Sequence, residues 1–224
     1  MSNTVIDLFS GVGGMSLGFE QAGFHTVIAN EFDKSIANAY KKNHLETEMI
    51  IGDITSLDLE HEFGKFKHKI DVIIGGPPCQ GYSQKGSRKT INDERNFLFK
   101  YFVKVVELVS PIYFVMENVP NLLTSENGYF RKELTDLFEK LGYSLAMDIV
   151  ASNYGVPQRR RRAIIKGKKG TKPIDFVLED SEKVTIWDAI SDLAFLESGE
   201  GCDKQEYLFP AETEYQEEMR QNSL

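Results

Sequence analysis

Short segments made almost entirely of apolar residues alternate along this chain with segments whose apolar residues recur at helical spacing. The apolar segments have the length of buried strands and lie at residues 4–9, 25–31, 49–53, 70–76 and 112–118. The helical segments lie at residues 11–23 (after a glycine turn), 33–43, 96–109 and 128–142, and two later strands are expected at 144–152 and 161–167. Asp33 is suited to cap the second helix, and Gly23 and Gly142 mark helix ends.

Strands that are apolar on both faces are typical of a sheet covered by helices on both sides. Their alternation with helices favours parallel pairing through crossover connections. The sequence therefore predicts an α/β fold with a doubly wound, mainly parallel sheet.

Charge is divided unevenly along the 224 residues. The formal net charge is −8, but the segment from Asp175 onward holds 14 acidic and 3 basic residues, so residues 1–174 carry +3. Residues 158–172 hold eight basic residues and no acid. Because affinity for phosphates depends on local positive surface, this run is a possible nucleic-acid contact. An exposed basic face or a localisation signal is the alternative interpretation.

Several classes of protein are excluded by simple counts. No apolar run approaches the roughly 18 residues that a membrane helix needs. The N-terminal residues lack the basic and apolar regions of a secretion signal, so we expect no membrane association and a cytoplasmic location. The two cysteines, Cys79 and Cys202, are far apart, and the four histidines have no zinc-like spacing, so we expect no metal and no disulfide.

Ligands of doubly wound sheets bind beyond the carboxyl ends of the strands. Gly11 and Gly13 follow the first strand, where a glycine turn lets a ligand approach the backbone, but the third glycine of the dinucleotide fingerprint falls on Ser16. Glu31 is suited to ribose hydroxyls, and Asp53 ends the third strand where an adenine amino group could bind. A nucleoside without pyrophosphate, such as S-adenosylmethionine, fits this pattern better than NAD. A tight turn without a ligand is the alternative.

Cys79 follows two prolines at the end of an apolar strand and precedes residues 84–95, which read as a mobile loop. A nucleophilic thiol needs positive surroundings, and the four arginines at 159–162 could supply them. Glu117 ends another apolar strand, where a half-buried carboxyl can share a proton. A buried structural cysteine and a solvated strand end are the alternatives for these two residues taken singly.

Four stretches of this sequence together resemble motifs of the bacterial DNA cytosine-5 methyltransferases. They are DLFSGVGGMSLGFEQAG, GGPPCQGYS, MENV and QRRRR, which correspond to the first motif, the catalytic motif, the acidic motif and the Gln-x-Arg-x-Arg motif of that family. They occur in the family's order and cover roughly residues 4–166. The resemblance implies the Rossmann-like fold of S-adenosylmethionine-dependent methyltransferases and methylation of carbon 5 of cytosine in double-stranded DNA.

The resemblance also implies roles for individual residues. The catalytic residues would be Cys79, Glu117, Arg160 and Arg162, and the substrate contacts Gln80, Ser83, Asn118 and Gln158. The cofactor contacts would be Phe9, Gly11, Gly13, Glu31, Phe32, Asp53, Ile54, Pro78 and Leu98. The thiolate of Cys79 would add to carbon 6 of a cytosine flipped out of the duplex, while Glu117 holds the ring nitrogen and amino group. Residues 84–95 would close over the base.

Family members continue into a target-recognition domain and then a final helix and strand, and residues after Arg162 match only the entrance to that part. We therefore expect a catalytic, cofactor-binding domain at 1–172 and an acidic connector at 173–224. Either a second polypeptide carries the missing part in a split enzyme, or the chain is truncated. A transfer RNA methyltransferase and a non-enzymatic module that binds cofactor or a partner are the alternative functions. The motif residues resemble those of the bacterial DNA enzymes, which favours a restriction–modification enzyme near the nucleoid.

Overall fold

The computed structural model describes residues 3–78, 97–151, 155–172, 174–175, 182–202 and 204–221. The chain forms two compact units. Unit 1 comprises Met1–Val150 and Arg162–Phe176, and unit 2 comprises Ala151–Arg161 and Val177–Leu224. The catalytic domain expected at 1–172 and the connector expected at 173–224 stay predictions.

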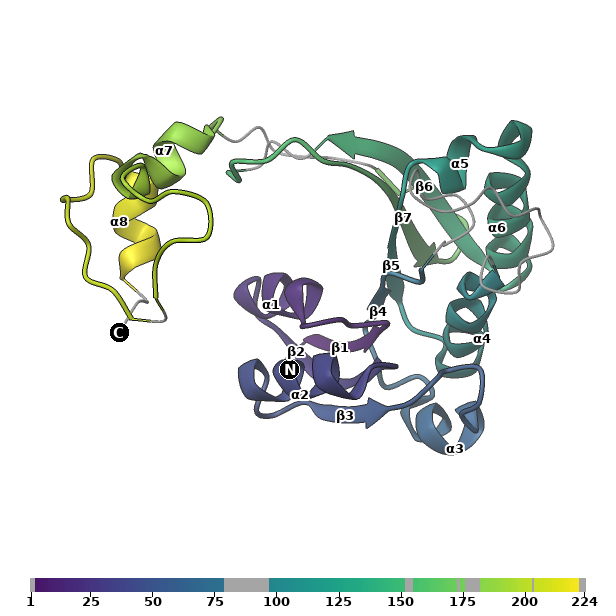
Figure 1. Ribbon diagram of the computed structural model, residues 1–224. Helices are drawn as coiled ribbons and strands as arrows, with labels where there is room; N and C mark the ends of the chain where they lie inside the picture. The colour runs from purple at the N-terminus through teal and green to yellow at the C-terminus, as the bar shows by residue number, and fades with distance from the viewer. Residues whose placement is uncertain are drawn as a thin grey trace. The chain divides into compact units, whose positions relative to one another are not determined.

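A seven-stranded sheet forms the centre of unit 1 (Figure 1). Its strands are β1 (Asn3–Leu8), β2 (Phe24–Glu31), β3 (Glu48–Ile51), β4 (Val72–Gly75), β5 (Tyr113–Asn118), β6 (Tyr143–Ala151) and β7 (Arg161–Lys169). They lie in the order β3-β2-β1-β4-β5-β7-β6. Four pairings, β1 with β2, β1 with β4, β2 with β3 and β4 with β5, are parallel, whereas β7 runs antiparallel to β5. This confirms the predicted mainly parallel, doubly wound sheet.

Helices connect the strands and cover the sheet. In unit 1 these helices are α1 (Gly14–Gln21), α2 (Lys34–Asn43), α3 (Leu59–Phe63), α4 (Phe99–Val109), α5 (Asn121–Thr124) and α6 (Tyr129–Lys140). Unit 2 contains the separate helices α7 (Ile186–Ile190) and α8 (Glu214–Arg220), which follow the last strand. Short 3₁₀ turns occupy Gly64–Phe66, Glu126–Gly128 and Ser191–Leu193. Asp33 caps α2 as expected, because its Oδ1 accepts hydrogen bonds from the backbone N–H groups of Ser35 and Ile36.

The main core lies between one face of the sheet and the helices α3, α4 and α6 (Figure 1). Phe102 of α4 and Phe138 of α6 pack on Phe114 of β5, and the Phe114 and Phe138 rings stack with centroids 4.0 Å apart. These side chains are fully buried. Each contributes about 1.5–3 kcal/mol of transfer free energy to folding, so this layer is the chief source of stability in unit 1.

The opposite face of the sheet is covered less completely. The side chains of Val5, Val72 and Ile74 form a small core there, and Met15 and Phe19 of α1 pack against it. Beyond this small core, the same face continues over β4, β5 and β7 as an apolar hollow.

Unit 2 is held together by polar contacts around its two helices. Thr185 and Asp188 form a reciprocal capping box at the start of α7. Arg220 of α8 pairs with the buried carboxylate of Asp192, and Gln216 donates a hydrogen bond of 2.8 Å to Ser191. The segment that the sequence described as an acidic connector therefore folds back on itself over its described residues.

Candidate functional site

A cavity of about 590 Å³ opens at the carboxyl ends of β1, β2, β3 and β4. It is lined by Phe9, Asn30, Glu31, Phe32, Asp33, Ile36, Gly52, Asp53, Ile54, Thr55, Gly76, Pro78 and Leu98. Seven of the nine residues expected to contact a cofactor are in this group, and Gly11 and Gly13 are not. The parallel strands bring these residues together because their carboxyl ends share one edge of the sheet.

The glycine turn between β1 and α1 forms one wall of this region. Gly11 and Gly13 have φ angles of 59° and 94°, in the region that favours glycine, and Phe9 has a φ of 56°. The backbone N–H of Gly11 donates to Oε2 of Glu31 at 2.9 Å, which ties the turn to the end of β2. Gly13 packs against His44 rather than facing the cavity.

Acidic and apolar groups alternate around the cavity. Oε1 of Glu31 accepts from the N–H of Asp33 at 2.9 Å, and Oδ1 of Asp53 accepts from the N–H of Thr55 at 2.9 Å. Both carboxylates are therefore held by backbone donors and keep further acceptor positions for hydroxyl or amino groups. Ile54 is buried, and the exposed ring of Phe32 offers a flat apolar surface.

A second group of residues lies at the end of β5. Glu117 and Arg162 form an ion pair across the antiparallel β5–β7 pairing, with 31% and 25% of their side chains exposed. A Cβ at Gly76 would come within 3.2 Å of Oε2 of Glu117, so glycine leaves room for this carboxylate. The partial exposure of this pair leaves the Glu117 carboxylate reachable by a ligand.

Asn118 anchors the segment that leads to the predicted nucleophile. Its buried side chain donates to the carbonyl oxygen of Pro77 at 2.7 Å, and its Oδ1 accepts from the N–H of Val119 at 2.9 Å. The end of β5 thus fixes the backbone two residues before Cys79. Cys79, Gln80, Ser83 and residues 84–95 lie outside the described residues.

Gln158 and Arg160 belong to unit 2, whereas Glu117, Asn118 and Arg162 belong to unit 1. Within unit 2, Gln158 lines a cavity of about 460 Å³ together with Arg159, Lys183 and Thr185. The side chains at 159–161 are exposed, which suits contact with phosphates. The structure therefore brings together three of the predicted reaction-site residues and places the other two described ones in unit 2.

Asn30 lines the cavity but was not predicted from the sequence. Its buried side chain donates to the carbonyl oxygens of Ile50 and Gly52 at 3.1 and 3.0 Å, which joins the ends of β2 and β3. The available signal was a polar residue directly before Glu31 in an otherwise apolar strand.

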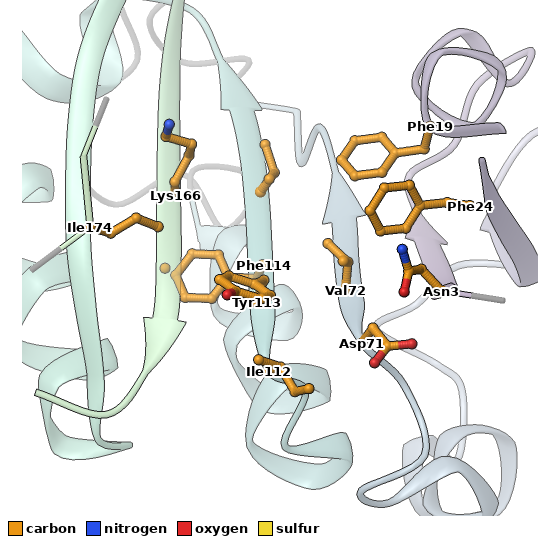
Figure 2. Close-up of a pocket in the computed structure, with 12 residues that line it drawn as sticks. Asn3, Phe19, Phe24, Asp71, Val72, Ile112, Tyr113, Phe114, Lys166 and Ile174 are labelled. Carbon is orange, nitrogen blue, oxygen red and sulfur yellow. The ribbon is translucent and has the colours of Figure 1, made fainter. Parts of the chain in front are cut away.

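A separate hollow of about 370 Å³ lies on the less covered face of the sheet, away from these residues (Figure 2). Figure 2 shows Phe19 and Phe24 on one side of it, Val72 on β4, and Tyr113 and Ile174 on the other side. Its lining is mainly apolar, and it contains none of the predicted site residues.

Among the residues that the structure describes, no group of His, Cys, Asp or Glu side chains could hold a metal ion. Within the same ranges, no helix is long and apolar enough to span a bilayer.

Comparison with known proteins gives consistent matches. Residues 3–223 match the family described as C-5 cytosine-specific DNA methylase. Type II methyltransferase M1.HphI of Haemophilus parahaemolyticus is 43% identical over 205 residues, which cover 89% of this chain and 55% of that protein. Type II methyltransferase M.AquIA of Picosynechococcus sp. is 37% identical over 188 residues, covering 79% of this chain and 76% of that protein.

Two solved structures share the fold. A prophage-encoded E. coli protein assigned as a DNA modification methyltransferase has a TM-score of 0.71 and 35% identity, covering 84% of this chain and 54% of its own. A DNMT2 variant from Spodoptera frugiperda has a TM-score of 0.66 and 24% identity, covering 89% of this chain and 61% of its own. The chain spans about half the length of most of the curated relatives that it matches.

The family match runs through nearly all of the sequence, and the expected motifs stand at the strand ends where the structure forms its cavity. The chain therefore belongs to the C-5 cytosine-specific DNA methylase family.

Proposed function

We propose that this chain is the catalytic part of a bacterial type II modification methyltransferase that methylates carbon 5 of cytosine in double-stranded DNA. The observation that carries the proposal is the arrangement at the end of β5. There the Glu117–Arg162 pair and the Asn118–Pro77 hydrogen bond lie beside a strand-end cavity lined by Pro78. A non-enzymatic module has no use for a carboxylate and a guanidinium held next to a Pro-Pro-Cys segment.

The cavity fits S-adenosylmethionine. Glu31 and Asp53 offer acceptors for ribose hydroxyls and an adenine amino group, and Phe32 and Ile54 offer apolar surface for a flat ring. Gly11 leaves its backbone approachable, because no atom lies within 4 Å of the position that a Cβ would take. When bound, this cofactor supplies the methyl group that ends on carbon 5.

The residues of the chain would act on the base as follows. The thiolate of Cys79 adds to carbon 6, which turns carbon 5 into a nucleophile. Glu117, paired with Arg162, contacts the ring nitrogen and the exocyclic amino group. In its protonated form it donates its proton to the ring nitrogen, which neutralises the negative charge that develops on the ring, and this proton returns to the carboxylate when the adduct collapses. After methylation, carbon 5 loses its proton and the thiolate leaves from carbon 6, which restores the aromatic ring and the free cysteine.

The DNA must present the cytosine outside the duplex, because a stacked base cannot reach a cysteine at the rim of the sheet. The exposed arginines at 159–161 would contact the phosphate backbone, which positions the duplex without reading its sequence. Such a substrate places the enzyme in the bacterial cytoplasm, at the nucleoid.

The hollow that the described residues of unit 1 leave open supports a second component of the enzyme. Monomeric proteins rarely leave large contiguous apolar patches exposed, and here Ile112 is 49% exposed beside the ring of Tyr113. The chain covers 55% of each of two curated relatives, so about 45% of their length lies outside the match. We propose that this additional part, in the same polypeptide or in a second one, packs an apolar segment over β4 and β5.

Covalent trapping tests the chemistry. The chain is incubated with S-adenosylmethionine and DNA containing 5-fluorocytosine, whose fluorine blocks the final loss of a proton. We expect a stable protein–DNA adduct that is absent in Cys79→Ser and retained in Cys202→Ser. Cys202 suits the control because its thiol is exposed in unit 2, where it donates a hydrogen bond to the carbonyl oxygen of Lys204. An adduct that persists in Cys79→Ser would refute the role of this thiol. A folded chain that binds no S-adenosylmethionine would refute the assignment of the cavity.

Thiol labelling tests whether a second component covers the hollow over β4 and β5. In the chain alone, Ile112→Cys should react rapidly with a maleimide, as followed on its own peptide by mass spectrometry. Co-expression with a second polypeptide that carries the additional part should slow labelling at position 112 at least tenfold. Leu45→Cys, at a site that is 85% exposed and is not among the residues that line the hollow, should be unaffected. Equal labelling of position 112 in both samples would contradict docking of a second polypeptide at this face.

A further inference from the structure

A row of buried polar side chains lies beneath the glycine turn that follows β1. Oγ of Ser16 in α1 donates to Oδ2 of Asp7 in β1 at 2.7 Å, and it lies 2.8 Å from the hydroxyl of Tyr40 in α2. All three side chains are fully or almost fully buried. Burial raises the pKa of Asp7 to about 7 despite the opposing hydrogen bonds from Ser16, and it raises the pKa of Tyr40 to about 12.

His44 extends this row to the turn itself. It caps the end of α2, its ring lies on that of Tyr40 with centroids 4.3 Å apart, and its Nδ1 is 3.0 Å from Oε2 of Glu20. A Cβ at Gly13 would come within 2.1 Å of Nε2 of His44 and 3.0 Å of Cδ2 of Tyr40. The turn therefore rests directly on the edges of two buried rings.

The turn that rests on these rings has a demanding conformation. Phe9, Gly11 and Gly13 all have positive φ angles, and a non-glycine residue such as Phe9 keeps such an angle only where the surroundings enforce it. Phe9 lines the cavity, and the N–H of Gly11 holds Glu31 in place. A shift of the turn would therefore move two cavity residues together.

Packing alone does not account for the polar row. Apolar side chains of similar shape could fill the space between β1, α1 and α2 at no loss of stability, since burying polar groups carries a desolvation cost. Hydrogen bonds differ from apolar contacts in fixing direction, and here they link each of the three elements that meet at the turn. The polar row thus specifies where the turn lies relative to both helices.

We propose that Tyr40 and His44 are positioning residues, which hold the Phe9–Gly13 turn in the conformation that binds the cofactor. Neither residue is among those that line the cavity, so they act through Gly13 and Ser16. This inference rests on the proposed binding of S-adenosylmethionine in that cavity.

Two mild substitutions test it in the full chain. Tyr40→Phe keeps the ring and removes the hydroxyl, and His44→Gln keeps a side-chain donor near Glu20 and removes the ring beneath Gly13. We expect the dissociation constant for S-adenosylmethionine, measured by calorimetry, to rise about fivefold in Tyr40→Phe, as loss of one hydrogen bond of about 1 kcal/mol implies. It should rise tenfold or more in His44→Gln, which loses the support under the turn.

Phe138→Leu serves as the matched control, because it weakens the core on the other face of the sheet. It should lower the unfolding midpoint at least as much as Tyr40→Phe and leave the dissociation constant unchanged. The inference is overturned if the dissociation constants of Tyr40→Phe and His44→Gln both lie within twofold of the wild-type value. It is also overturned if Phe138→Leu raises the dissociation constant as much as they do.

Amide resonances separate this inference from the proposed function. In the chain without cofactor, Tyr40→Phe and His44→Gln should each shift the backbone amide signals of Gly11 and Gly13 in an NMR spectrum. Phe138→Leu should leave these signals in place. If the wild type binds no S-adenosylmethionine, the proposed function fails on its own account. If the glycine signals also stay in place, the positioning role of Tyr40 and His44 fails as well.

Discussion

Gly75, the last residue of β4, sets how closely the two central strands approach each other. It pairs with Leu8 of β1, and a Cβ added to it would lie 2.4 Å from the Leu8 carbonyl oxygen and 3.2 Å from Cε2 of Phe102. Because ordinary contact begins near 3.4 Å, Gly75→Ala requires a displacement of about 1 Å. The obstructing atom is a backbone carbonyl within a paired strand, so it cannot rotate away as a flexible side chain would.

The cost of Gly75→Ala can be estimated from these contacts. Overpacking of a core typically costs 1–3 kcal/mol, and a weakened ladder hydrogen bond adds about 1 kcal/mol, which gives a loss of about 2–4 kcal/mol. With a urea m-value of about 3 kcal/mol/M, the unfolding midpoint should fall by about 1 M.

Gly18→Ala is the matched control for urea unfolding followed by circular dichroism. Gly18 lies within α1, and no atom comes within 4 Å of an added Cβ, so this change should stabilise the chain by up to about 1 kcal/mol. A Gly75→Ala midpoint within about 0.2 M of the wild type, at equal m-value, would show that β1 and β4 can separate freely and would refute the reasoning.

Three further predictions concern the site and its support. Glu117→Gln should lower single-turnover methylation of DNA by about 10²–10⁴-fold, and a rate within tenfold of the wild type would contradict its role. Asn118→Ala leaves the buried Pro77 carbonyl without the donor it has now and should lower the free energy of unfolding by about 1–3 kcal/mol, measured in urea; a loss below about 0.5 kcal/mol would contradict this. The raised pKa of Asp7, from 3.8 to about 7, means that the folded chain retains a proton there which the unfolded chain releases, so this group makes stability fall as pH rises from about 4 to about 7. Asp7→Asn should flatten the pH dependence of the urea midpoint in this range. An unchanged pH dependence would show that a group other than Asp7 causes it.

The sequence predicts the sheet and the cavity well because both depend on local patterns. Wholly apolar strands can be recognised singly, and their ends then share one edge, which is why Glu31, Asp53 and Pro78 meet without any long-range information. The roles of these residues, and those of Cys79 and Arg160, stay predictions.

Other features depend on contacts that no local pattern contains. The apolar spacing of 161–167 is the same in either chain direction, so the antiparallel placement of β7 could not be predicted. The helices α3 and α5, of five and four residues, are too short to show a period. His44 gives no sign in the sequence that it lies under Gly13, and the pairing of Arg220 with Asp192 joins positions 28 apart.

The strand order has a consequence for synthesis on the ribosome. β1 lies between β2 and β4, but β4 begins 64 residues after β1 ends, at Val72 after Leu8. At about 5–20 residues per second, β1 is complete for roughly 3–13 s before its second neighbour exists. During that interval one edge of the future central strand has unpaired N–H and C=O groups, and the nascent chain is open to pairing with the wrong strand. A translational pause between codons 8 and 72 should therefore lower the yield of folded protein more than a pause of equal length after codon 118, when β1, β4 and β5 have all been made.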